Sequence, residues 1–125
     1  MKYKNNPANI RSGSRWLGLS GNRNGFCEFE TLEYGVRALL YILHKYYYVY
    51  HLVSVTDILN RFAPPSENDT KSYISYCEAR IDFSVPNLFI AQLARCICKY
   101  ESGSEIDIEF IIKVYNKLRL RFNFI

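Results

Sequence analysis

The sequence predicts a single α+β domain that is mostly α-helical, with a small β-hairpin near its N-terminus. Its 125 residues are enough to bury one hydrophobic core without a disulfide or a metal staple. From residue 31 onwards, apolar residues recur with helical spacing. Before them, two short apolar runs flank a segment that is dense in turn-forming residues. Neither internal repeats nor linkers are evident, so we expect residues 1–125 to form one domain.

The predicted hairpin pairs residues 15–19 with residues 26–29. The segment between them, Ser20–Gly25, contains Ser, Gly and Asn, which favour turns. A hairpin of two short strands is not stable alone in water. We therefore expect it to pack against the helices.

The first long helix is expected to begin after Thr31, whose hydroxyl suits an N-cap. It should end in the run from Tyr46 to Tyr50, because aromatic and β-branched residues are weak helix formers. Between these limits, apolar residues recur on one face, which predicts a buried stripe. They are Leu32, Val36, Leu39, Leu40, Leu43 and Tyr47.

Four further helices are expected in the rest of the chain. Thr56 would cap the first, residues 57–62, which Pro64-Pro65 would end. Several candidate caps in residues 66–70 precede the second helix, which extends through Arg80. The third and fourth, residues 87–100 and 107–120, each carry an apolar stripe.

Composition narrows the function classes. The net charge is +4, but the basic residues are scattered, so no specific nucleic-acid partner is predicted. No apolar run reaches the roughly 18 residues that a membrane span requires. The first residues lack the apolar core of a secretory signal, so we expect the protein to be made in the cytoplasm. The chain contains 11 Tyr, 8 Phe and 1 Trp, which suits a solvent-filled groove as well as a core.

The cysteines and histidines predict no metal site, and we expect no cofactor. No Cys-x-x-Cys pair occurs, and on a helix Cys96 and Cys98 would point about 200° apart. His44 and His51 would lie roughly 10 Å apart along one helix, too far to share a zinc ion. We expect four reduced, semi-buried thiols.

Four segments in a fixed order carry a resemblance to a known family. They are Asn5–Arg11, Trp16–Gly18 followed by Phe26 and Phe29, Tyr34–Leu39, and Arg61–Thr70. Together they resemble a family of phage and prophage proteins from Bacteroidetes-like hosts, labelled either virion structural proteins or peptidoglycan-degrading enzymes. The resemblance covers roughly residues 5–103. Two departures are mild: Ala8 stands where the family usually has Gly, and Phe62 where it usually has Trp.

A looser resemblance implies a chemistry. The stretch from Asn9 to Phe29 looks like an "asparagine-x-glycine-isoleucine-lysine … tryptophan-x-glycine" stretch of bacterial glucosaminidases, which have the lysozyme-like fold. In those enzymes it forms part of the glycan groove and follows a helix that ends in a catalytic Glu-Ser-Gly. Here Glu101-Ser102-Gly103 ends a late apolar helix instead, which implies a circularly permuted, lysozyme-like domain. The structural alternative is that Gly103 is a helix C′ residue and Glu101 lies on the surface.

Glu101 is the candidate general acid for cleavage of a glycosidic bond. Such an acid must be protonated near neutral pH, and apolar or aromatic surroundings favour its uncharged form. Glu101 follows Tyr100 and an apolar helix, which are suitable neighbours. Glu33 and Glu67 are candidates for a second catalytic carboxylate. Alternatively, Glu33 supports the N-terminus of the first helix and Glu67 belongs to a helix-capping loop.

Five further residues are candidates for binding substrate: Asn9, Arg11, Trp16, Arg37 and Asn68. Trp16 offers a platform for stacking a sugar, or it joins the hairpin to the core. Arg11 and Arg37 would position glycan or stem-peptide carboxylates, although Arg37 has an alternative partner one helical turn away. Asn68 lies in a polar loop made rigid by two prolines, which either reaches the groove or caps the next helix.

The residues and the resemblances together favour a phage-type peptidoglycan hydrolase that cleaves the glycan strand by general acid catalysis. It would act at the bacterial cell wall or be carried in a phage particle, with other virion proteins as further partners. The alternative is a non-catalytic virion or cell-wall-binding protein of the same fold. A third reading, a small nucleic-acid-binding protein, rests on the charge alone. The bond that is cleaved, and whether hydrolysis or transglycosylation cleaves it, stay open.

Overall fold

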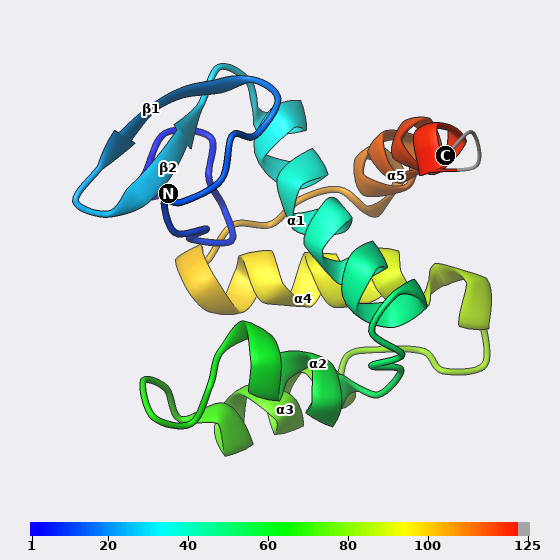
Figure 1. Ribbon diagram of the computed structural model, residues 1–125. Coiled ribbons are helices and arrows are strands. Elements are labelled where there is room, and N and C mark those ends of the chain that lie inside the picture. The colour runs from blue at the N-terminus through cyan, green and yellow to red at the C-terminus, as the bar shows by residue number, and fades with distance from the viewer. Residues whose placement is uncertain (123–125) are drawn as a thin grey trace.

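The computed structural model describes residues 1–122 and confirms an α+β protein that is mostly helical, with an N-terminal hairpin (Figure 1). Helix α1 crosses the molecule diagonally, with the hairpin at one end and α4 running beneath it (Figure 1). The elements are β1 (Leu19–Arg23), β2 (Phe26–Phe29), α1 (Leu32–Tyr48), α2 (Val55–Phe62), α3 (Thr70–Glu78), a 3₁₀ turn η1 (Pro86–Leu88), α4 (Phe89–Ser102) and α5 (Ile108–Phe122).

The hairpin is shifted along the chain relative to the sequence prediction. Strand β1 begins at Leu19, and Asn24 and Gly25 form a two-residue turn in which both have positive φ. Asn-Gly is favoured at this turn because both of its central residues need left-handed backbone. The prediction of a strand over residues 15–19 is therefore wrong, and most of the segment expected to be a turn lies in β1.

Helix α1 begins and ends where the sequence predicts. The Thr31 hydroxyl accepts a hydrogen bond from the backbone N–H of Tyr34, which makes Thr31 the N-cap. The helix ends at Tyr48, within the aromatic run. Its buried face packs on α4 and α5, and this packing joins the two ends of the chain into one core.

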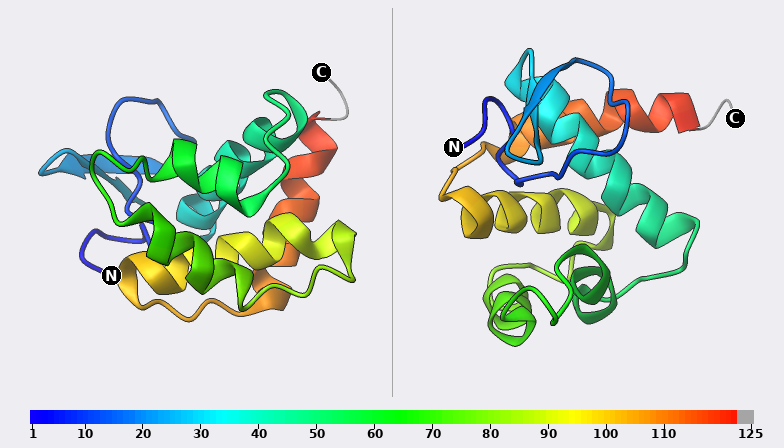
Figure 2. Two further views of the ribbon diagram at one scale, coloured as in Figure 1. Left: turned by 90° about the horizontal axis from the view of Figure 1, so that it is seen from below. Right: turned by 60° about the vertical axis from the view of Figure 1, so that its left-hand side comes forward.

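Helices α2 and α3 lie side by side, and α3 packs on α4 (Figures 1 and 2). The cap of α2 is Ser54, whose hydroxyl accepts from the N–H of Asp57, so the cap lies two residues before the predicted cap Thr56 and the helix begins at Val55. The cap of α3 is Asp69, as the candidate caps in residues 66–70 allow. The loop between the two helices carries Glu67 and Asn68.

Helix α4 is the most deeply buried element, since every residue from Phe89 to Ala94 is buried. It ends at Gly103, whose φ of 68° is left-handed and favours glycine. This end lies beneath the N-terminal loop (Figure 1). None of the helices formed by residues 1–122 is both long and apolar enough to span a bilayer.

Candidate functional site

The N-terminal segment, residues 3–11, is fixed by a buried asparagine. Asn6 is fully buried, and its side-chain amide donates to the carbonyl oxygens of Ile10 (3.0 Å) and Cys27 (2.8 Å). Its side-chain oxygen accepts from the N–H of Ile10 at 2.9 Å. Asn6 thus closes the loop on itself and joins it to β2, because buried polar groups are stable only when they are hydrogen-bonded.

A glycine in α1 lets the same segment approach the helix closely. A Cβ at Gly35 would lie 1.8 Å from the carbonyl oxygen of Asn5, so a larger residue would displace backbone. On its other side, the segment is joined to β2 by hydrogen bonds from Phe29 N to Lys4 O and from Cys27 N to Ile10 O, each 2.9 Å. The loop is therefore held between α1 and β2, and its position is defined by buried contacts.

This rigid loop brings Asn9 to the end of α4. The Asn9 side-chain amide donates to the backbone oxygen of Glu101 at 3.1 Å and to its carboxylate oxygen Oε1 at 3.2 Å. Asn9 itself has a left-handed backbone with φ of 52°, a conformation that asparagine tolerates better than most residues. Two candidate residues 92 positions apart in the sequence are thus in direct contact.

The three residues of the Glu-Ser-Gly motif have separate roles. Ser102 donates from its hydroxyl to the carbonyl oxygen of Pro7 at 2.7 Å, which ties the end of α4 to the N-terminal segment. Gly103 donates its N–H to Lys99 O at 2.9 Å and ends the helix. Glu101 is left half-buried with its side chain toward a pocket. The capping role that the sequence allows for Gly103 and the exposure of Glu101 to a pocket therefore coexist.

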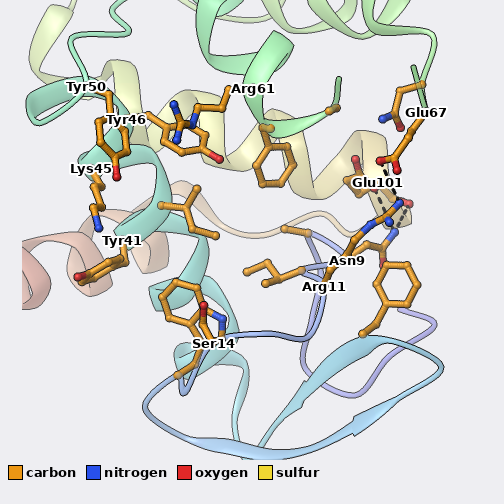
Figure 3. Close-up of a pocket in the computed structure, with 18 residues that line it drawn as sticks. Asn9, Arg11, Ser14, Tyr41, Lys45, Tyr46, Tyr50, Arg61, Glu67 and Glu101 are labelled. Carbon is orange, nitrogen blue, oxygen red and sulfur yellow. Dashed lines mark hydrogen bonds and ion pairs between the residues drawn. The ribbon is translucent and has the colours of Figure 1, made fainter. Parts of the chain in front are cut away.

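The pocket next to Glu101 has a volume of about 540 Å³. It lies between the N-terminal segment, α1 and the α2–α3 loop (Figure 3). Six of the eight residues that the sequence predicts for the site line it: Asn9, Arg11, Trp16, Glu67, Asn68 and Glu101. A pocket of this size is typical of small-molecule sites.

One side of Glu101 is aromatic. Tyr73 is buried below it, with its ring stacked on that of Tyr100 at 3.9 Å between centroids. Burial, and then the negative charge of Glu101, raise the pKa of Tyr73 far above its usual value. The same two causes raise the pKa of Cys98 to about 12. The Glu101 carboxylate therefore stands beside a phenol and a thiol that both stay protonated at neutral pH.

Glu67 brings a second carboxylate to the same end of the pocket (Figure 3). It lies 3.4 Å from the guanidinium of Arg11, and the side chains of Arg11 and Glu67 are 66% and 51% exposed. The loop that carries Glu67 is closed by hydrogen bonds from Glu67 N and Asn68 Nδ2 to Pro64 O. Because the ion pair is solvated, it contributes little to stability but sets where the two side chains lie.

Trp16 both packs on the core and lines the pocket. It is half-buried and meets the ring of Tyr41 edge-on at 5.6 Å. Its indole Nε1 is buried without a hydrogen-bond partner among residues 1–122.

Two other buried polar atoms without such partners lie next to Glu101. They are the side-chain oxygen of Asn9 and the hydroxyl of Tyr73, which lies beside Glu101 without meeting hydrogen-bond geometry. A buried polar group without a partner costs about 1 to 3 kcal/mol. Such groups are rare in folded proteins, and binding of a polar ligand or water is one explanation for those that line this pocket, Asn9 and Trp16.

Glu33 and Arg37 do not reach this pocket, so the prediction that they share a groove with Glu101 is wrong. They line a separate hollow of about 430 Å³ between α1 and α5. Glu33 pairs with Lys117 at 3.4 Å rather than with Arg37. The pKa of Arg37 is lowered first by burial and then by the nearby Arg121. The first turn of α1 faces α5, which points these side chains away from α4.

The other end of the pocket consists of residues that were not predicted for the site from the sequence. Lys45 and Tyr46 in α1, Tyr50 after it, and Arg61 in α2 line this end (Figure 3). The dense tyrosine run signals phenols on an exposed face, but no local pattern indicates that Arg61 meets them. A metal centre is not evident here, because no three His, Cys, Asp or Glu side chains within residues 1–122 are grouped to hold an ion.

Comparison with known proteins yields one informative similarity. No family model matches the chain. The chain is 42% identical over 79 residues to "Protein P5" of Pseudoalteromonas phage PM2, an alignment that includes 58% of this chain and 49% of that protein. The chain thus spans about half the length of the curated relative that it matches. The chain is therefore similar to a phage protein.

Proposed function

We propose that the protein binds a peptidoglycan glycan strand in the pocket that Asn9 and Glu101 line and cleaves it with Glu101 as general acid. One observation carries the proposal. A carboxylate at the end of a buried helix is held by Asn9 at the edge of a pocket that also contains Trp16 and a second carboxylate. An acid, a positioning amide and an aromatic platform are the groups that cleavage of a bound sugar chain requires.

The proposed step is a proton transfer coupled to bond cleavage. Protonated Glu101 gives its proton to the glycosidic oxygen while the bond from that oxygen to the anomeric carbon breaks. The bonding pair leaves with the oxygen, which becomes a hydroxyl, and positive charge develops on the sugar ring. Water or a hydroxyl of the same sugar then adds to the anomeric carbon, and its proton returns to Glu101.

The role of Glu67 distinguishes two versions of this chemistry. A free Glu67 would act as base or nucleophile toward the anomeric carbon, as in two-carboxylate glycosidases. Its ion pair with Arg11 instead engages the carboxylate, which favours a single-acid reaction, in which a hydroxyl of the sugar itself adds. The arrangement of the pocket therefore favours intramolecular transfer over direct hydrolysis.

The similarity to a phage protein supports delivery of this activity in a phage particle. The order of these segments along the chain supports the hypothesis of a permuted, lysozyme-like domain, since the groove wall comes from the N-terminal segment and the acid from α4. Both statements belong to the proposal.

The test is release of soluble fragments from dye-labelled, purified peptidoglycan by the full chain and by single variants. Because positioned proton donation is worth about 10² to 10⁴ in rate, Glu101→Gln should lower turnover at least hundredfold. Glu67→Gln distinguishes the two-carboxylate reaction from the single-acid reaction. A decrease in turnover of less than about tenfold supports the single-acid reaction.

The matched control is Glu109→Gln, since Glu109 is an exposed carboxylate outside the pocket. It should leave turnover unchanged. If the wild-type chain releases nothing, the catalytic proposal fails.

A second candidate function is glycan binding without cleavage. It is favoured by the contacts that engage both pocket carboxylates, Glu101 with Asn9 and Glu67 with Arg11. A chain that sediments with insoluble peptidoglycan but releases no fragments would support this function, as a virion protein that attaches to the cell wall.

A further inference from the structure

The end of the pocket opposite Glu101 is built from cations held on tyrosine rings. The guanidinium of Arg61 lies 4.4 Å from the ring centroid of Tyr50 and 5.3 Å from that of Tyr46. The ammonium of Lys45 lies 5.8 Å from the ring of Tyr50. Figure 3 shows these side chains together, across the pocket from Glu67 and Glu101.

No carboxylate neutralises this end. Within residues 1–122 neither Lys45 nor Arg61 forms an ion pair. The two acids of the pocket stand at its other end, and one of them is engaged by Arg11. Tyr46 stays neutral, because burial raises the pKa of its phenol more than Arg61 lowers it. The pocket is therefore divided into an acidic and a cationic end.

The tyrosines also fix the orientation of the guanidinium. An arginine stacked on aromatic rings loses less freedom when it binds a ligand, and its planar fork then matches the two oxygens of a carboxylate. The hydroxyl groups of Tyr46 and Tyr50 add further hydrogen-bonding capacity at the same end. The arrangement suits an anion with planar, paired oxygens.

We propose that Arg61 and Lys45 bind a carboxylate of the peptidoglycan stem peptide while the glycan strand lies over Glu101. The proposal rests on the proposed function and deepens it by naming the substrate class: strands that still carry their peptides. One continuous pocket joins the two ends, so a ligand that fills it needs a neutral sugar portion near Trp16 and an anionic branch near Arg61.

The experiment measures binding calorimetrically with Glu101→Gln in the full chain, so that ligands stay intact. The two probes are soluble peptidoglycan strands with intact stem peptides and the same strands stripped of their stem carboxylates by conversion of these groups to amides. Removal of the peptide by an amidase is avoided, because it would free a new carboxylate on each muramic acid. A charge-assisted hydrogen-bonded pair is worth about 1.5 to 3 kcal/mol, so strands with free stem carboxylates should bind at least tenfold more tightly than stripped ones.

Adding Arg61→Met should abolish this preference and leave the affinity for stripped strands unchanged. Methionine keeps an apolar stem against the tyrosines, and Lys45→Met, which should reduce the preference severalfold, serves as a second variant if Arg61→Met fails to fold. The matched control is Arg95→Met, because Arg95 lies on the α4 surface outside this pocket. It should preserve the preference in full.

Equal affinity of the Glu101→Gln protein for both kinds of strand would overturn the inference and leave the proposed function standing. An equal loss for both strands in Arg61→Met would also overturn it. Failure to bind either strand would overturn the proposed function and the inference together.

Discussion

Two hollows of this protein contain the same kinds of residue and differ in how those residues are held. The pocket between the N-terminal segment and α4 holds Glu101 and Arg11, and the hollow between α1 and α5 holds Glu33 and Arg37. In the first, Asn9 is fixed by a buried loop and binds the carboxylate. In the second, Glu33 meets Lys117, whose side chain is 72% exposed. Residue type alone does not make a site; a buried framework that positions the side chains does.

The largest expected difference between the two hollows concerns their carboxylates. In the fragment-release assay, Glu101→Gln should reduce turnover at least about hundredfold, because it removes the proton donor. Glu33→Gln should change turnover by less than about twofold, because the solvated pair that it breaks contributes little. A loss with Glu33→Gln that matches the loss with Glu101→Gln would erase the functional distinction between them.

The second difference concerns stability. Asn6→Ala should lower the free energy of unfolding by about 3 kcal/mol, because it leaves the N–H of Ile10 and the C=O of Cys27 buried without their side-chain partner and removes one of the two donors to the C=O of Ile10. Lys117→Ala should lower it by less than about 0.5 kcal/mol, as expected for an exposed ion pair. Urea unfolding followed by circular dichroism measures both. Similar losses would mean that the N-terminal loop is not the framework of the pocket.

A third and smaller effect isolates the contact between Asn9 and Glu101. Asn9→Gly keeps the left-handed backbone, since glycine adopts positive φ readily, and removes only the amide. We expect kcat/KM to fall about tenfold, the equivalent of one charge-assisted hydrogen bond. Arg37→Met, in the other hollow, is the control and should leave kcat/KM unchanged. Loss of folding in Asn9→Gly, seen as a large drop in Tm, would contradict this assignment.

The smallest effect is a pH dependence on the α1–α5 side. Burial, and then the charge of Arg119, lower the pKa of His44, whose Nδ1 lies 2.6 Å from the Tyr115 hydroxyl. A lowered pKa in the folded state means that folding disfavours the protonated ring. The contribution of His44 is thus complete above its ordinary pKa of 6.5 and is lost as the pH falls below that value.

The urea midpoint should therefore drop less in His44→Gln than in the wild type between pH 7.5 and pH 5.5. Glycan affinity at pH 7.5 should be the same in both proteins, because His44 lies outside the pocket. Identical pH slopes of the midpoint would contradict the account of His44.

Local sequence patterns predict the helices better than they predict the site. The apolar stripe and the Thr31 cap define α1, and the tyrosine run ends it. The α2 cap is misassigned because Ser54 and Thr56 are both good caps. With Ser54 as the cap, Val55 is the first residue of the helix and is buried. The hairpin is misplaced because an Asn-Gly turn is shorter than the turn-rich segment around it.

The site depends on contacts that no local pattern encodes. Asn9 and Glu101 meet because Gly35 and Asn6 seat the N-terminal loop, which the sequence indicates only through a family resemblance. Arg61 reaches the pocket because the chain turns back between α1 and α2, and spacing along either helix cannot reveal it. Glu33 is adjacent to the hairpin in sequence, but the helix rotation directs it to α5.

The central claim is that the pocket cleaves the sugar backbone of peptidoglycan and that Glu101 supplies the proton. The most direct test is mass spectrometry of the soluble products that the wild-type chain and Glu101→Gln release from purified peptidoglycan. The account predicts wild-type products with new sugar termini, all peptide bonds intact, and at least hundredfold less product with Glu101→Gln. Products cut at amide bonds, or equal yields from the two proteins, would contradict it.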